Sequence, residues 1–318
     1  MWSSFTNSSY KLINKEIIVD SNFINKVKTI RREIYNLPNV IYTIDKTTIS
    51  NTLLKKYSNS IWVSTELSWN YLPVEYKISW LNNNIYIKTT QKRFDIFSKR
   101  LDVFLKILNY INKSNQPMTI YLILSDLKKK AESNKIISPN HINSGYTDPI
   151  NQYIFIWRDE EFEKVTFHEV IHLLYKDHRH EDVDLDLNID GPTLYFEAIT
   201  DFKAIIFNII YISIITKVKL ELIFNNEYHF IYNQAKHINK YINKKNNIKQ
   251  KSPAYSYFIL KYFIFKFFSN IFDEELFNEL FYNNINYSKL IDKIKDYKLN
   301  ETNFIDFNSA RMTLHELK

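Results

Sequence analysis

Two histidines and three acidic residues between positions 168 and 201 have the types and the spacing of a metal centre. His168, Glu169 and His172 form an H-E-x-x-H sequence. On an α-helix, residues four apart lie on one face, so both imidazoles can bind one metal ion while Glu169 projects about 100° away. A catalytic zinc ion takes three protein ligands and a water molecule, whose pKa it lowers to about 7. Because Glu169 could accept that proton, the motif predicts a zinc hydrolase.

The third ligand is predicted to be Glu197. Gly191 and Pro192 can begin a new helix, because proline is tolerated in the first helical turn. That helix would place Glu197 and Asp201 one turn apart on one face. Glu197 could then bind the metal, while Asp201 accepts a hydrogen bond from the second ring nitrogen of His168. The alternative is an amphipathic helix with two solvated acids.

His178 is the rival third ligand. The spacing from His172 to His178 matches the H-E-x-x-H-x-x-G-x-x-H pattern of another class of zinc peptidases, but Tyr175 occupies the glycine position. A tyrosine forced to a positive φ would cost about 1–2 kcal/mol, so Glu197 is favoured. His178 and Arg179 could still line the cleft, and the alternative is that both are solvated loop residues.

From His168 to Asp201, about a tenth of the chain, the sequence resembles the gluzincins. These are zinc metallopeptidases with an H-E-x-x-H helix and a downstream glutamate on a second helix. The resemblance implies zinc ligands at His168, His172 and Glu197. It also implies a general base at Glu169 and a supporting carboxylate at Asp201. The gap between His172 and Glu197 is somewhat longer than in the best-known gluzincins, and the subfamily stays open.

A second resemblance covers residues 143–147, the strand-like residues 153–157 and the helix that follows. These segments are similar to zincin-like proteins of large DNA viruses. Abundant Ile, Asn, Lys, Phe and Tyr with two glycines suggest an AT-rich coding genome, which fits a viral protein as well as a parasite or an endosymbiont. The absence of cysteine excludes disulfides and cysteine-ligated zinc. With no secretory signal, a cytoplasmic location is expected, in the host cytoplasm or the virion if the chain is viral.

The expected fold class is α+β and zincin-like, with a small mixed sheet packed on the H-E-x-x-H helix and a mostly helical second half. We expect an α/β part over 1–190, a helical part over 191–318 and a catalytic cleft between them. The apolar stretch 204–215 is too short to span a bilayer. The predicted helices are 21–36, 93–112, 192–217, 221–243, 253–271, 273–282 and 287–297; the predicted strands are 40–43, 76–81, 85–89, 120–124 and 153–157; and 133–152 is a predicted loop.

Tyr255 and Tyr257 lie in an aromatic segment and are candidates to stabilise the oxyanion formed at the scissile carbonyl. Packing in the core is the alternative for both. A carboxypeptidase would also need a basic side chain for the substrate carboxylate, and Arg179 is the candidate. The choice between endopeptidase and carboxypeptidase stays open at this point.

The net charge of +7 leaves a second class of function open. Lysines at 128–130, 244–245, 249 and 251 could bind nucleic acid or another polyanion, although such runs are usually solvated. The positive charge could equally favour an acidic protein substrate. A third hypothesis is a degenerate zincin that keeps the metal only as a scaffold. The favoured hypothesis is a zinc metallopeptidase acting on a peptide or protein.

Overall fold

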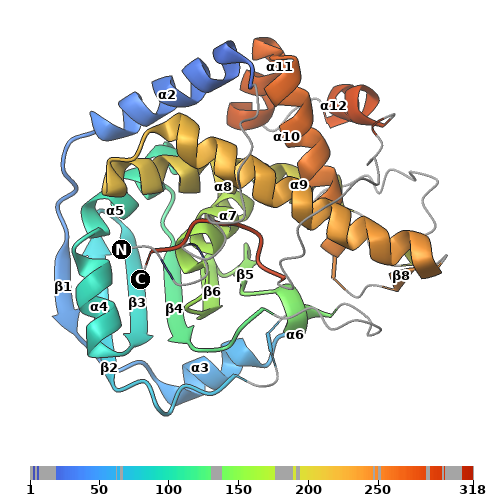
Figure 1. The fold of residues 1–318 in the computed structure, drawn as a ribbon. Helices are drawn as coiled ribbons and strands as arrows, with labels where there is room; N and C mark the ends of the chain where they lie inside the picture. The colour runs from blue at the N-terminus through green and yellow to red at the C-terminus, as the bar shows by residue number, and fades with distance from the viewer. Residues whose placement is uncertain are drawn as a thin grey trace.

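The chain folds into a mixed six-stranded β-sheet and a set of helices packed around it (Figure 1). The predicted α+β class is therefore confirmed. The computed structural model describes Ser3, Thr6 and residues 19–61, 63–64, 67–129, 138–175, 189–190, 194–245, 248–249, 252–283, 287–295, 297 and 310–317.

The strands of the sheet run in the order β1-β2-β3-β4-β6-β5. Strands β3, β4 and β6 are parallel, and the other neighbouring pairs are antiparallel. The strands are β1 (Thr43–Lys46), β2 (Val74–Trp80), β3 (Asn83–Thr89), β4 (Thr119–Ser125), β5 (Gly145–Asp148) and β6 (Tyr153–Arg158), and a separate parallel pair is formed by β7 (Ile189–Asp190) and β8 (Ile248–Lys249).

Helices before and after the sheet strands supply most of the core. The helices are α2 (Ser21–Tyr35), α3 (Asn51–Ser58), α4 (Gln91–Ser98), α5 (Leu101–Ile111), α6 (Pro139–Ile142), α7 (Phe162–Tyr175), α8 (Tyr195–Thr216), α9 (Leu220–Lys245), α10 (Lys261–Asn270), α11 (Glu274–Asn278) and α12 (Tyr287–Ile294), with π-helical turns η1 (Ser256–Leu260) before α10 and η2 (Glu279–Asn283) after α11.

The central strands are buried on both faces, as their apolar runs predict. Along β4, successive side chains point to opposite faces of the sheet. Ile120 and Leu122 join the main core, and Ile123 joins a second cluster with Leu54 and Tyr57 of α3. The main core contains side chains from both predicted parts, 1–190 and 191–318. The division of the chain into these two parts stays a prediction.

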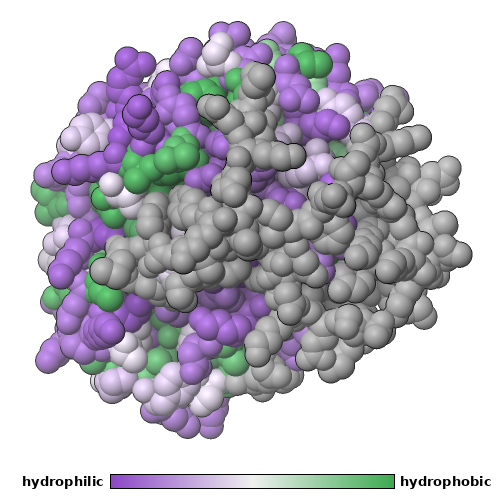
Figure 2. Space-filling view, viewed as in Figure 1, coloured by the Kyte–Doolittle hydropathy of each residue, from purple (hydrophilic) through white to green (hydrophobic). Residues whose placement is uncertain are grey.

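Helix α8 is the one helix, among the residues that the structure describes, with the length and hydropathy to cross a bilayer. Helix α8 begins nine residues before the apolar stretch 204–215, so that stretch alone underestimates the length of the helix. In its most apolar window 89% of the residues are buried, which makes it a core helix and leaves no clear membrane span in the described ranges. On the face drawn in Figure 2, hydrophilic side chains predominate in the described part, with smaller hydrophobic patches between them.

The predicted loop over 133–152 is wrong in two places. Residues Pro139–Ile142 form the short helix α6, and Gly145–Asp148 form β5, which pairs with β6. The sequence of β5 contains glycine and aspartate and only four residues, so it has a turn-like composition. Its extended conformation comes from pairing with β6 rather than from local preference.

The predicted helix 93–112 is also wrong, because the chain forms two helices, α4 and α5. Arg100 lies at the break between them, and its guanidinium reaches Glu163 on α7 at 3.3 Å. The first strand is likewise displaced from the predicted 40–43 to Thr43–Lys46, where all four residues are exposed and pair with β2.

Candidate metal centre

Helix α7 carries the H-E-x-x-H sequence through the interior of the protein. Every side chain from Phe162 to Leu173 is buried, and the helix packs against β5, β6 and α8. A helix that is buried on all sides is normally apolar. His168, Glu169 and His172 are therefore polar groups that need partners inside the protein.

Helix α8 supplies partners for the two histidines. It begins at Tyr195, with Leu194 at the N-cap position donating its backbone N–H to the Ser256 hydroxyl at 2.8 Å. Glu197 lies in the first turn of α8 and Asp201 one turn later, so both face α7. The proposed helix opening at Gly191 and Pro192 lies outside the described residues.

Three possible metal-binding atoms converge between α7 and α8. The Nε2 atoms of His168 and His172 are 2.9 Å apart. The Oε2 atom of Glu197 is 3.3 Å from the first and 3.2 Å from the second. Ligands held tetrahedrally about 2.0–2.1 Å from a zinc ion would lie about 3.3 Å from one another. The spacing of this His168–His172–Glu197 cluster therefore fits one zinc ion.

The charges of these groups also fit a cation. Burial, followed by the effect of His172, lowers the pKa of His168 to about 3, so its imidazole is neutral near pH 7. Burial alone would raise the pKa of Glu197, but His172 and His168 together hold it well below its usual range. A neutral histidine and an ionised carboxylate are the forms in which these side chains bind metal.

Asp201 lies behind His168. Its Oδ1 atom is 3.3 Å from Nδ1 of His168, the ring nitrogen that faces away from the cluster. Lys164 contacts the same carboxylate, and Nζ of Lys261 donates to its Oδ2 at 2.7 Å. Asp201 thus has the position of an outer partner of a candidate ligand histidine, with the amine groups of two lysines on its other sides.

Glu169 faces β5 rather than the three converging atoms. The Thr147 hydroxyl is 2.8 Å from Oε2 of Glu169 and 2.9 Å from its backbone carbonyl. Burial raises the pKa of Glu169 to about 7, although His172 and Thr147 oppose that effect. A carboxylate with this pKa suits proton transfer near neutral pH.

A cavity of about 290 Å³ opens beside the cluster. Tyr257 lies in its wall and donates its hydroxyl to Oε2 of Glu197 at 3.0 Å. Tyr255 is buried and is not among the lining residues, and the candidates His178 and Arg179 lie outside the described residues. The cavity is lined by Asn143, Gly145, Tyr146, Thr147, His168, Glu169, His172, Leu194, Phe196, Glu197, Pro253 and Tyr257.

Three polar residues of this site were absent from the sequence prediction. Thr147 belongs to the short strand that the sequence reads as loop. Lys164 has a local signal, because it lies one turn before His168 on the same helix face. Lys261 has none, since 60 positions separate it from its partner Asp201.

Gly145 lets β5 approach α7 closely. A Cβ atom at this position would lie 2.9 Å from Cγ1 of Val165 and 3.0 Å from Cγ of Glu169. We expect Gly145→Ala to lower the free energy of unfolding by about 1–3 kcal/mol, because the strand or the helix must shift. The candidate site should also be distorted, since Glu169 is one of the side chains displaced.

Thermal unfolding would measure the loss of stability, with Ser144→Ala as the neighbouring control that adds no Cβ atom. A Gly145→Ala protein as stable as the wild type would contradict the close strand–helix contact.

The chain matches no protein-family model, and neither curated proteins nor solved structures give a significant match. The function must therefore be inferred from the geometry and chemistry of this site.

Proposed function

We propose that the chain is a zinc-dependent peptidase of gluzincin type. The observation that carries the proposal is the convergence of His168 Nε2, His172 Nε2 and Glu197 Oε2 within 4.8 Å of one another beside an open cavity. These three side chains would hold the metal. Three protein ligands and an accessible fourth side are the arrangement of a catalytic zinc site, whereas a structural site is closed by four ligands.

A bound zinc ion would acidify a water molecule and polarise the scissile carbonyl. Glu169 lines the same cavity and lies next to His168 in the chain. Its carboxylate can accept the proton of the attacking water and deliver it to the leaving amine. Thr147 holds that carboxylate from the side of β5, so its orientation does not depend on the substrate.

The position of β5 favours an extended peptide as substrate. β5 ends the sheet, and within the described residues it pairs only with β6. Gly145, Tyr146 and Thr147 of this edge strand also line the cavity. A peptide could add to an exposed strand edge through its backbone hydrogen bonds, with its carbonyl carbon directed at the cluster. An antiparallel edge strand beside the metal helix also supports the zincin-like fold class.

Tyr257 is the favoured oxyanion donor. Burial raises the pKa of its hydroxyl well above the usual value, so the hydroxyl keeps its proton. We expect Tyr257→Phe to lower kcat about 10²–10³-fold while zinc binding is retained, as for the loss of one oxyanion donor. Steady-state kinetics would measure the loss. Tyr255→Phe is the control, because Tyr255 does not line the cavity; equal losses in both variants would argue for a packing effect.

The test of the proposed function combines metal analysis with hydrolysis. Purified protein should contain one zinc ion per chain by elemental analysis, and it should cleave members of a peptide library in a chelator-sensitive way. A chain that binds no zinc after gentle purification and reconstitution would sink the proposal. A chain that holds zinc and cleaves no peptide would support the degenerate, scaffold-only alternative.

A basic hollow keeps polyanion binding as the second candidate function. It has a volume of about 500 Å³, is lined by Lys28, Arg31, Arg32, Lys217 and Lys219, and contains one acid, Glu221, paired with Lys28. The structure describes the predicted lysine runs only in part. Lys129 is buried against Glu161, and the side chains at 244, 245, 249 and 251 lie outside the described residues.

A further inference from the structure

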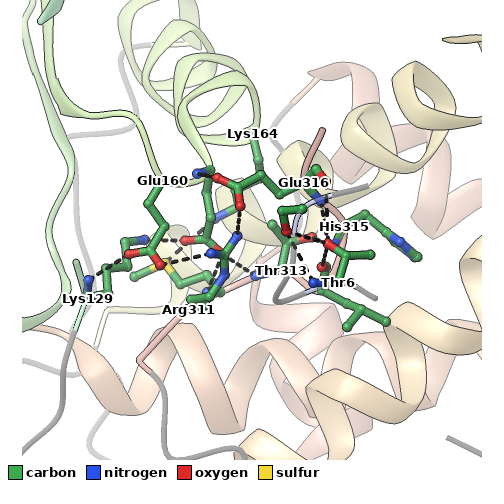
Figure 3. A network of polar contacts seen from close by, with 12 residues as sticks. Thr6, Lys129, Glu160, Lys164, Arg311, Thr313, His315 and Glu316 are labelled. Atoms are coloured by element: carbon green, nitrogen blue, oxygen red, sulfur yellow. Dashed lines mark hydrogen bonds and ion pairs between the residues drawn. The ribbon is translucent and has the colours of Figure 1, made fainter. Parts of the chain in front are cut away.

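Residues 310–317 form a buried segment without helical structure, which we call the 310–317 segment (Figure 3). All eight of its side chains are buried, including Arg311, Thr313, His315 and Glu316. Irregular backbone inside a protein must find partners for its N–H and C=O groups. Several of the partners found here are titratable side chains, namely Glu161, Glu227, Lys261 and Arg93.

Two buried carboxylates bind the backbone of the 310–317 segment. Oε1 of Glu161 accepts the N–H groups of Met312 and Thr313 at 2.8 and 2.7 Å. Glu227 accepts the N–H of Leu314 at 3.0 Å and the Thr313 hydroxyl at 2.8 Å. Burial opposes the ionisation of Glu161, but Lys129 and Arg311 lower its pKa, and hydrogen bonds to an ionised acceptor are about twice as strong as neutral ones. The segment is thus held at fixed points by groups on either side of it.

Arg311 ties the segment to the chain just before α7. Its guanidinium lies 2.8 Å from Oε1 of Glu160 and 3.0 Å from Oε2 of Glu316. Glu316 also accepts the backbone N–H of Glu161 at 3.2 Å. Glu161 itself has a φ of 59°, a left-handed conformation that is uncommon for any residue other than glycine. The residues just before α7 and the 310–317 segment therefore hold each other in place.

Met312 connects this segment to the metal centre. Its carbonyl oxygen accepts a hydrogen bond from Nζ of Lys261 at 3.0 Å. The same ammonium group donates to Oδ2 of Asp201 at 2.7 Å, and Oδ1 of Asp201 is 3.3 Å from Nδ1 of His168. Lys164, the other cation on Asp201, lies 3.7 Å from the Met312 sulfur. A continuous path of contacts thus runs from the 310–317 segment to a candidate ligand.

The path has a physical consequence for metal binding. An ammonium group has three protons to donate, so Lys261 can hold Met312 and Asp201 at once. A carboxylate fixed on one oxygen presents the other in a set direction, and this direction sets the orientation of the His168 ring. Loss of such an outer partner typically lowers metal affinity about 10–100-fold.

We propose that the 310–317 segment helps to position a ligand of the metal centre. Through its carbonyl at Met312 it positions Lys261, which positions Asp201, which holds the His168 imidazole in its ligand orientation. This inference rests on the proposed function, because it requires that the His168–His172–Glu197 cluster binds zinc. It adds that Lys261 is a positioning residue and that a segment more than a hundred positions away helps to set metal affinity.

The test measures Zn²⁺ affinity by chelator competition and records the absorption spectrum of the Co²⁺-substituted protein. Lys261→Met should lower Zn²⁺ affinity about 10–100-fold and change the Co²⁺ spectrum, because the His168 ring is no longer held. Lys88→Met is the control. Lys88 is also buried and forms an ion pair with Glu75, but it lies on β3 and does not contact Asp201. This variant should lose thermal stability without change in the affinity or the spectrum.

A double-mutant cycle tests the role of the segment itself. Arg311→Met loosens the segment without touching Asp201 or Lys261, and it should lower Zn²⁺ affinity in the wild-type background. In the Lys261→Met background the same change should have little further effect, because both act on one path. Additive losses, or an unchanged affinity and spectrum in Lys261→Met, would overturn the inference and leave the peptidase proposal standing. A wild-type chain that binds neither ion would overturn both.

Discussion

Glu169→Gln should leave zinc binding intact and lower the rate of peptide hydrolysis about 10²–10⁴-fold. The substitution keeps the size of the side chain but removes the group that accepts a proton, and general-base catalysis is worth that much. The Thr147 hydroxyl donates to Oε2 of Glu169, which is not among the three converging atoms, so the candidate metal ligands should be unaffected. Elemental analysis and kcat/KM on one preparation would measure both properties.

Glu163→Gln is the matched control for this experiment. Glu163 is also buried on α7, but it faces Arg100 and does not line the cavity. Its replacement should cost stability and leave the catalytic rate of the folded protein close to wild type. Full activity in Glu169→Gln would contradict the role of Glu169 as the base. Loss of zinc from that variant would instead show that Glu169 contributes to metal binding.

Glu197→Ala should remove the zinc. Only His168 and His172 would remain of the three converging groups, and a catalytic zinc site needs three protein ligands. Removal of a direct ligand should lower Zn²⁺ affinity more than removal of an outer partner does. We therefore expect the affinity to fall more than about 100-fold. Chelator competition and metal content after dialysis would measure the change, and hydrolysis should disappear with the metal.

Two comparison variants separate the alternatives. Glu221→Ala removes an exposed glutamate from the first turn of α9 and should keep the metal. His178→Ala removes the rival ligand of the sequence analysis and should keep it as well. If His178→Ala loses the zinc and Glu197→Ala retains it, the ligand assignment made from the cluster is wrong.

The parts of the site that local sequence predicts are those on long helices. The four-residue spacings of His168 with His172 and of Glu197 with Asp201 already place each pair on one helix face. The structure then brings the two faces together across α7 and α8. No pattern within either helix fixes this docking, which depends on the packing of the whole core.

The parts that sequence could not predict depend on distant partners. β5 is extended because it pairs with β6, although its own residues favour a turn. Arg100, at the break between α4 and α5, is buried and reaches Glu163, which is 63 positions away. In β5 a non-local contact thus outweighs the local preference, so the residues of β5 alone do not predict its structure.

The burial of three lysines could not be predicted from the sequence either. Lysine is almost never buried without a partner, so the sequence alone predicts that a lysine is solvated. Lys129, Lys164 and Lys261 are all buried because Glu161 and Asp201 lie within reach of their ammonium groups. The sequence contains these charges, but their pairing becomes visible only in the folded chain.

The position of the 310–317 segment also sets an order of events during synthesis. Residues 168–201 leave the ribosome well before residues 310–317, so every candidate ligand is available before the segment that supports the centre. Domains generally begin to fold as they are synthesised. Here Glu161 and Glu227 acquire their backbone partners, and Lys261 its carbonyl, only when the later segment docks. We therefore expect metal binding at the cluster to be a late step, because a nascent chain stalled before residue 310 carries the candidate ligands without the contacts that support them.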